Sequence, residues 1–464
     1  MKRHAKDAKG SPRSGGPFCV GDRRTSGNAG QPNGVRIGMK RRIDGFLHHV
    51  RTPVALAALL VGGACSTAPT EGRPPGALTQ LPRALTASEV KVRDAANAFA
   101  FALWAKINAG QRDTSVFVSP LSASFALGMT LNGAAGTTAD QMRTALQFGG
   151  ATMAEINGGY KSLVALLTSL DPGVQMQIAN SIWYRQEFPF KQSFFDTTRV
   201  YFDAAVRGLN FADVPASLAA INGWVSTATN GKIPAVLDNI QAQQVMFLIN
   251  AIYFKGSWRA KFDPAKTEAT SFHAVGGASQ SVSLMHQLDT LSYAETATYQ
   301  AADLPYGNTA FTMTVLLPKS GTDVESLAAS LTPAAWQALT SSLRTQKVDF
   351  AMPKLTLKYE RKLNGDLQGL GMVQPFVPDG ADFTQMAAAP VGKQLFIDFV
   401  KQNTFVAIDE EGTEAAAVTT VGVSVTSYTP SPVMRVDRPY LFVLRERLTG
   451  TVLFMGKIVR MPPA

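Results

Sequence analysis

The chain has 464 residues, and its composition of 45% hydrophobic, 17% charged and 9% aromatic residues is that of a folded globular protein and excludes a disordered or collagen-like one. The net charge of +10 is concentrated at the N-terminus, because residues 1–64 contain 12 basic and 3 acidic side chains whereas residues 65–464 contain 32 and 31. The nearly neutral body gives no indication of nucleic-acid binding, and the absence of cysteines beyond Cys19 and Cys65 excludes a disulfide scaffold, a cysteine-ligated zinc site and a cysteine nucleophile there.

Residues 39–65 have the layout of a secretory signal. Basic residues between positions 40 and 51 precede an apolar run at 54–61 that is too short to span a bilayer, and small residues lead to Cys65. This layout is similar to a bacterial lipoprotein signal, although Gly62 stands where Leu or Val is usual. We expect a secreted protein, extracellular or periplasmic, held on a membrane by a lipid on Cys65. Ordinary cleavage near Cys65, with a soluble secreted product, is the alternative.

The segments on either side of this signal have no core-forming pattern. Residues 1–38 are rich in Gly, Arg, Ser and Pro, and Met39 begins a complete signal by itself, so we predict that translation starts at Met39. The alternative is that 1–38 form a disordered basic tail. Residues 66–85 contain four prolines and are predicted to be a flexible linker.

The first part of the body, from residue 86, is predicted to be mainly helical. Apolar residues between Val92 and Ile107 recur at helical spacing, which predicts a helix that ends before Gly110. A short strand at 116–118 leads into a helix capped by Ser119 and Pro120. Further helices are predicted from Thr138 to the glycines at 149–150 and over residues 162–170.

Strands become frequent after residue 174. Runs of β-branched or aromatic residues predict strands at 174–184, 245–254, 311–317, 348–352 and 395–400. Residues 440–444 and 452–459 flank Thr449-Gly450 and predict a hairpin. Because helices dominate early, strands dominate late and no linker divides 86–464, the sequence predicts one large domain of the α+β class.

The body lacks the motifs of the common enzyme classes. Its two histidines, His273 and His286, fit no helical metal pair, and the zinc-protease, serine-hydrolase and phosphate-loop motifs are absent. We interpret His286 as a structural residue, and the acidic run 409–411 as the solvated end of a strand rather than an acid–base or cation site. The sequence therefore predicts no enzyme activity, no metal and no cofactor.

The segment 409–434 combines features of a loop and of a strand. Residues 415–434 carry no charge, and the odd-numbered positions from Thr413 to Val425 are all small or β-branched. A segment of this kind, held outside a sheet, would gain about ten backbone hydrogen bonds at roughly 1 kcal/mol each on inserting as a central strand. Cleavage would free its end to insert. A passive linker or an edge strand is the alternative.

Four stretches of the chain resemble the serpins, the serine-protease-inhibitor family. Residues 410–417 are similar to the serpin hinge, and the other matching stretches are 117–122, 250–258, and 437–442 together with 454–457. The resemblance covers about 88–464. It implies three β-sheets with eight or nine α-helices and an exposed reactive-centre loop. It also implies a monomer that traps a serine protease covalently: the protease cleaves the loop, forms an acyl-enzyme and is inactivated when the loop inserts.

The resemblance assigns roles to two groups of residues. The implied hinge consists of Glu410, Glu411, Gly412, Thr413, Glu414, Ala415, Ala416, Ala417 and Val418. The implied sheet-opening region consists of Ser119, Ser122, Asn250, Trp258 and Gln402. Two positions depart from the family pattern, because Val418 is larger than the usual alanine and Gln402 replaces a histidine found in many members.

The position of the reactive bond depends on the end from which it is counted. Counting from the hinge gives Thr426–Ser427, and counting back from Pro439 gives Tyr428–Thr429. Neither choice suits a trypsin-like protease, since no Lys or Arg follows the hinge before Arg435. The first bond suits an elastase- or subtilisin-like protease and the second a chymotrypsin-like one. A non-inhibitory serpin that acts as a binding or chaperone module is the alternative function.

Overall fold

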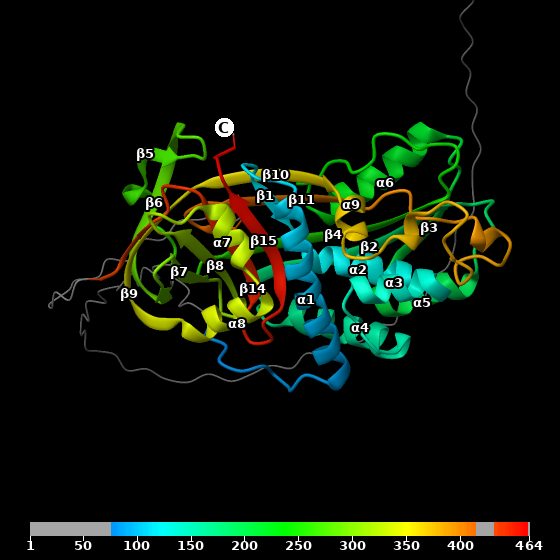
Figure 1. The fold of residues 1–464 in the computed structure, drawn as a ribbon, viewed down its shortest axis with the longest axis horizontal. Helices are drawn as coiled ribbons and strands as arrows, with labels where there is room; N and C mark the ends of the chain where they lie inside the picture. Colours follow the sequence, from blue (N-terminus) through cyan, green and yellow to red (C-terminus); the bar gives the residue numbers. More distant parts are fainter. Residues whose placement is uncertain (1–75, 414–430, 463–464) are drawn as a thin grey trace, which may run out of the picture. The chain divides into compact units, whose positions relative to one another are not determined.

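The computed structural model describes residues 76–413 and 431–462 (Figure 1). The predicted signal with Cys65, the hinge residues Glu414 to Val418 and both candidate reactive bonds lie outside the described residues. Among the residues that are described, no helix combines the length and the apolar character needed to cross a membrane.

The predicted early helices are present, and their caps explain where they begin. Helix α1 (Ala87–Ala109) starts at Thr86, whose side chain forms a capping box with Glu89. Strand β1 (Val116–Val118) leads into α2 (Pro120–Leu131), which is capped by Ser119 as expected. Helix α3 (Gly136–Ala145) begins two residues before Thr138. Helix α4 (Met153–Ser169) begins well before the predicted residue 162, at a second capping box made by Thr152 and Glu155.

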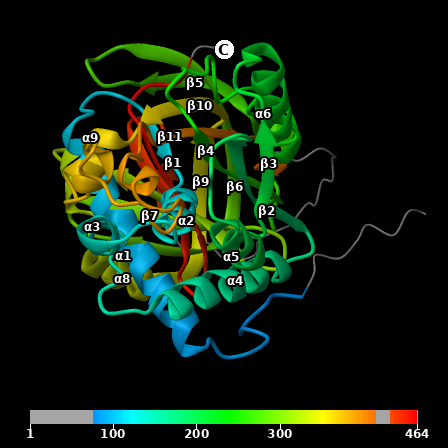
Figure 2. The same ribbon diagram turned by 90° about the vertical axis from the view of Figure 1, so that its right-hand side faces the viewer.

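Five more α-helices complete the set of nine in the described part of the chain. They are α5 (Gln192–Phe202), α6 (Val214–Ala228), α7 (Val324–Ser330), α8 (Pro333–Ser342) and α9 (Asn364–Gln368). Helices α2 and α6 lie on opposite sides of strand β4 (Met246–Ser257) (Figures 1 and 2). Phe254 of β4 belongs to the main core, whereas Phe247 belongs to a smaller core with Ile221 of α6.

A six-stranded sheet contains β4 at its centre. Its order is β10 (Leu355–Lys362), β11 (Lys401–Ile408), β12 (Gly412–Thr413), β4, β2 (Val174–Arg185) and β3 (Ala205–Leu209). The predicted strand at 395–400 is wrong, because β11 begins only at Lys401. The backbone of that segment is bonded elsewhere: Ile397 N–H donates to the Pro375 carbonyl, and Val400 N–H to Asn364 Oδ1.

The other strands form one nine-stranded sheet by hydrogen bonding. Its members are β1, β15 (Val452–Ile458), β14 (Tyr440–Glu446), β8 (Phe311–Pro318), β7 (Tyr299–Pro305), β6 (Ser279–Glu295), β9 (Arg344–Pro353), β13 (Val433–Arg435) and β5 (Glu268–His273). The predicted hairpin is confirmed as β14 and β15. The α+β class is also confirmed, but the described residues give two continuous sheets instead of three. The reason is that the long β6 pairs with β9 over 284–293 and with β7 over 292–295, so it joins two groups of strands.

The segment before α1, described from Gly76, is attached to the body. Leu78 N–H donates to the Asn308 carbonyl at 2.6 Å, and the Arg447 guanidinium donates to the Leu78 carbonyl. Leu81 and Leu85 are partly buried against the core. The part of the predicted linker 66–85 that the structure describes is therefore held by specific contacts.

Candidate functional site

The six-stranded sheet is open between β4 and β11. The two-residue strand β12 pairs antiparallel with both neighbours, with Thr413 opposite Ile408 on one side and Gly256 on the other. Strands β4 and β11 consequently run in the same direction. Beyond Thr413 no described backbone group of β11 pairs with β4, so the two strands border a slot.

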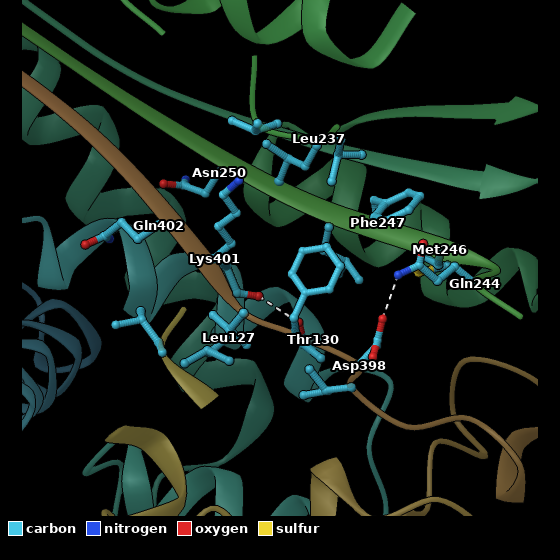
Figure 3. Close-up of a pocket in the computed structure, with 18 of the residues that line it drawn as sticks. Leu127, Thr130, Leu237, Gln244, Met246, Phe247, Asn250, Asp398, Lys401 and Gln402 are labelled. Atoms are coloured by element: carbon cyan, nitrogen blue, oxygen red, sulfur yellow. Dashed lines mark hydrogen bonds between the residues drawn. The ribbon is translucent and has the colours of Figure 1, made fainter. Parts of the chain in front are cut away.

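A cavity of about 210 Å³ lies in this slot (Figure 3). Its walls are residues 246–251 of β4 and residues 394–403, which comprise the segment before β11 and the first residues of that strand. Leu127 and Thr130 of α2 lie on one side and Val225 of α6 on the other. A second, small hollow lies next to Thr413, between residues 252–254 and 405–407. The cavity and the small hollow thus lie one after the other along the slot between β4 and β11.

Two side-chain contacts bridge the far end of the slot. Gln244 Nε2, just before β4, donates to Asp398 Oδ2 at 2.6 Å (Figure 3). The ammonium of Lys401 lies 3.9 Å from an Asp238 carboxylate oxygen and 3.0 Å from one of Glu360. Both contacts across the slot, Gln244–Asp398 and Lys401–Asp238, lie at the surface and therefore link its two rims, β4 and β11, only weakly where the backbones of these strands are not paired.

Gly412 permits the chain to enter the slot. Its φ of +155° lies in the region that favours glycine, and an added Cβ would lie 2.1 Å from the Gly256 carbonyl oxygen. Any side chain at position 412 would therefore displace β12 from β4. The predicted hinge role of Gly412 has a steric basis in this close approach.

Thr413 is the last described residue in the slot, and it is 3% exposed. Its Oγ1 shares a hydrogen bond of 2.6 Å with the hydroxyl of Tyr306, whose ring stacks on Trp258 at a centroid separation of 4.5 Å. Trp258 Nε1 in turn donates to the Asp409 carbonyl at 2.9 Å. Burial raises the pKa of Tyr306, so its hydroxyl stays protonated.

The carboxylates of the acidic run 409–411 are bound by backbone amides or lysine side chains. The interpretation of this run as a solvated strand end is therefore wrong. Asp409 Oδ1 accepts from the Glu411 and Gly412 amides, and burial raises the Asp409 pKa. Glu410 is 7% exposed and lies 2.7 Å from Lys354 Nζ. Burial alone would raise the Glu410 pKa, but hydrogen bonds to its carboxylate, chiefly from Lys354, keep that pKa below its ordinary value. Glu411 lies 2.6 Å from Lys261 Nζ.

Four of the five proposed sheet-opening residues meet under the slot. Gln402 of β11 accepts from Ser119 N–H at 3.0 Å and donates to the Ser119 carbonyl at 2.7 Å. Asn250 of β4 accepts from the Ser122 hydroxyl and donates to Asn180 Oδ1 at 2.7 Å. Both rims are thereby attached to the first turn of α2. Trp258 is not part of this cluster, because it lies at the other end of β4 beside Thr413.

Comparison with known proteins agrees with this geometry. The family model described as Serpin (serine protease inhibitor) matches residues 94–461. The chain belongs to the serpins. An uncharacterised serpin-like protein of Thermococcus kodakarensis is 30% identical over 376 residues, 80% of this chain and 86% of the relative. The leukocyte elastase inhibitor of Xenopus laevis is 30% identical over 369 residues, 77% of this chain and 96% of the relative.

Solved serpin structures show the same fold. The thermophilic serpin tengpin in its native state has a TM-score of 0.73 and 28% identity, covering 83% of this chain and 97% of its own. Human thyroxine-binding globulin has a TM-score of 0.73 and 26% identity, covering 81% and 100%. As a family, serpins are protease inhibitors rather than proteases, and they form covalent complexes with their target proteases.

The sequence did not reveal the residues that hold the hinge. Tyr306, Lys354, Lys261 and Thr267 contact residues 410–413, but each lies far from them in the chain and belongs to no motif. They lie after β4, before β5, after β7 and between β9 and β10, and only the tertiary structure brings these segments to one place.

Proposed function

We propose that this serpin inhibits serine endopeptidases in a single-use reaction. The protease cleaves the loop that follows Thr413 and forms an acyl-enzyme, and the freed loop inserts between β4 and β11 before the ester is hydrolysed. The observation that supports this proposal is the open slot with Gly412 and Thr413 already paired at its mouth. A chain that continued in the same direction would complete the sheet.

The register of β12 indicates which loop residues would occupy each part of the slot. Continuing it from Thr413 places Thr419 between Asn250 and Gln402, and Val423 opposite Met246, the first residue of β4. The candidate bond Thr426–Ser427 then falls just beyond the end of β4. Insertion would thus carry an attached protease over the length of a 12-residue strand, roughly 40 Å.

The side chains of the loop suit the two faces of that slot. Odd-numbered residues would face α2, as Thr413 does, so Ala415 and Ala417 would enter first and the valines at 421 and 423 would fill the cavity. The hydroxyl of Thr419 would lie between two amide side chains, where a polar group can be hydrogen-bonded. Val418 would face α6 with the other even-numbered residues, so its extra bulk would be accommodated by packing on that side.

The absence of Lys and Arg from residues 415–434 also indicates which class of protease the loop would attract. With Thr426 or Tyr428 before the reactive bond, we propose an elastase-, subtilisin- or chymotrypsin-like protease and not a trypsin-like one. The test is incubation of the purified protein with one protease of each class, followed by a denaturing gel. We expect a covalent band of the combined mass with at least one protease and cleavage at 426–427 or 428–429. Cleaved protein without such a band, from every protease, would contradict inhibition and leave the non-inhibitory binding or chaperone module.

We further propose that the protein acts as a monomer, as the serpin resemblance implies. On the basis of residues 39–65 alone, we propose that it is secreted and anchored by a lipid on Cys65. Mass spectrometry of the mature N-terminus from wild type and Cys65→Ser tests this. A lipid mass on Cys65 that disappears in the variant is expected. A mature chain without lipid in the wild type would indicate the soluble secreted form instead.

A further inference from the structure

One face of the nine-stranded sheet presents two exposed aliphatic side chains in a single row. Leu288 of β6 pairs with Asp349 of β9, and Asp349 pairs with Val433 of β13. Leu288 is 49% exposed and Val433 is 60% exposed, whereas the neighbours Val348, Phe350 and Met434 are buried on the opposite face. The two aliphatic groups are therefore about 10 Å apart, two strand spacings, on the outer face.

The polar group between them already has a partner. His286, two residues from Leu288 on the same face of β6, lies 2.6 Å from the Asp349 carboxylate through Nε2. Because the central carboxylate already has one hydrogen-bond partner, a protein that covers this surface desolvates it at a lower cost than it would an unpaired carboxylate. The row therefore resembles the centre of a small interface: aliphatic side chains lie at its two ends, and the hydrogen-bonded His286–Asp349 pair lies between them.

The row is also held rigidly. The Val433 carbonyl accepts from Gln300 Nε2 at 2.8 Å, and Asp349 N–H donates to the Pro432 carbonyl at 2.9 Å. Arg435, further along β13, donates to Glu268 of β5 at 2.9 Å. Strand β13 is thus fixed on several sides, and a fixed aliphatic group loses little conformational entropy when a partner covers it. Strands β5, β6 and β9 lie together at the left of Figure 1.

The length of the intervening chain indicates what would cover this row. Only residues 427–432 separate the candidate bond after Thr426 from Val433, so the bond can be no more than about 25 Å from Val433 even in extended chain. A protease domain has a radius of roughly 20 Å, so a protease seated on either candidate bond is large enough to reach β13. This constraint applies only on the C-terminal side of the loop, because the N-terminal side reaches the bond through a longer segment.

We propose that Leu288, the His286–Asp349 pair and Val433 form an accessory docking surface for the target protease, in addition to the loop itself. The proposal rests on the proposed inhibitory function. The surface would increase the affinity of the first, non-covalent encounter, through an apolar patch of the protease near its substrate cleft. It would have no part in loop insertion, because it lies outside the six-stranded sheet.

The experiment compares wild type with the double variant Leu288→Gln/Val433→Thr, which keeps side-chain size and, at 433, the β-branched shape. The matched control is Val200→Thr, a substitution of another exposed valine, 53% exposed, on α5. The first measurement is the dissociation constant of each protein for the target protease with its catalytic serine replaced by alanine. The second is the rate and final yield of covalent complex with the active protease. Melting temperatures of the three proteins verify folding.

We expect the double variant to bind roughly tenfold more weakly and to react correspondingly more slowly, with an unchanged final yield of complex, while Val200→Thr behaves as wild type. Wild-type affinity and rate in a double variant that folds and forms complex would overturn the docking surface and leave the inhibitory function intact. A concentration-dependent dimer of the wild type that the double variant lacks would assign the row to a second copy of the chain and overturn the proposal. Failure of every protease to form a complex with wild type would reject the inhibitory function and this proposal together.

Discussion

The hydroxyl groups of Tyr306 and Thr413 share a buried hydrogen bond of 2.6 Å. Tyr306 directly follows the strand β7, and Thr413 is the last described residue in the slot between β4 and β11. The same turn that contains Tyr306 continues to Asn308, whose carbonyl accepts from Leu78 N–H in the segment before α1. The hinge is therefore held through a turn that the N-terminal segment also contacts.

Replacing Tyr306 with Phe should weaken the attachment of the hinge. The substitution preserves the stacking on Trp258 but leaves the Thr413 hydroxyl without its partner, which should lower the free energy of unfolding by about 1 kcal/mol. Urea denaturation measures this change. Tyr359→Phe is the control, because that hydroxyl bonds Gln111 at 3.0 Å away from the hinge. Equal losses in both variants would argue against a particular role for the Tyr306 bond.

Replacing Thr413 with Arg should convert the inhibitor into a substrate. The position is 3% exposed, and an unpaired guanidinium buried there would cost several kcal/mol. The variant should therefore hold its hinge outside the slot, so that insertion starts too late to precede hydrolysis of the acyl-enzyme. We expect cleaved Thr413→Arg without covalent complex, and no rise in its melting temperature after cleavage. Cleaved wild type and cleaved Thr413→Ser should melt at higher temperatures than their intact forms. Wild-type yields of complex from Thr413→Arg would contradict the insertion mechanism.

Gln402 should contribute to stability through the backbone of Ser119. In Gln402→Leu the buried Ser119 N–H loses its acceptor, while the Ser119 carbonyl keeps the amide of Ala123, so we expect a loss of about 1–3 kcal/mol. Thermal or urea unfolding tests this. The neighbouring Asn403→Ala removes a bond to Glu360 at the surface and should change stability by less than about 0.5 kcal/mol. A change in Gln402→Leu no larger than in Asn403→Ala would show that the two bonds to Ser119 contribute little.

Glu89 should make stability depend on acid pH. Hydrogen bonds from Arg83, and further ones from Ser162 and Thr86, outweigh burial and lower the Glu89 pKa to about 2. A lowered folded-state pKa adds stability above the ordinary value of 4.5, and this contribution is lost as the pH falls towards 2. Glu89→Gln should therefore cost about 1–2 kcal/mol at pH 7, allowing for solvent around the half-exposed Arg83, and progressively less on acidification.

The measurement is the free energy of unfolding of wild type and Glu89→Gln between pH 7 and pH 2.5. Glu155 forms the equivalent capping box on α4 with a more exposed carboxylate, so Glu155→Gln should have a smaller effect. A difference between wild type and Glu89→Gln that stays constant over this pH range would mean that the Glu89 charge is not what stabilises the start of α1.

Local signals in the sequence predicted the beginnings of several elements. Ser119 caps α2, as predicted, because a hydroxyl beside free N–H groups stabilises a helix start wherever the helix packs. The same locality explains the hairpin of β14 and β15. The strand expected at 395–400 failed for the opposite reason: its apolar side chains suit a strand, but its backbone is bonded to Pro375 and Asn364, which sequence periodicity does not reveal.

The order of residues alone determined the hinge motif, its glycine, and the long uncharged run with small or β-branched residues at alternate positions, because each of these depends only on neighbours in the chain. The tertiary structure decided where that run could go. The slot between β4 and β11, the pairing of Glu410 with Lys354, and the row of Leu288, Asp349 and Val433 all depend on strand register between distant segments. Register is set by the packing of the whole domain, since a shift of one residue would turn every side chain of a strand to the opposite face.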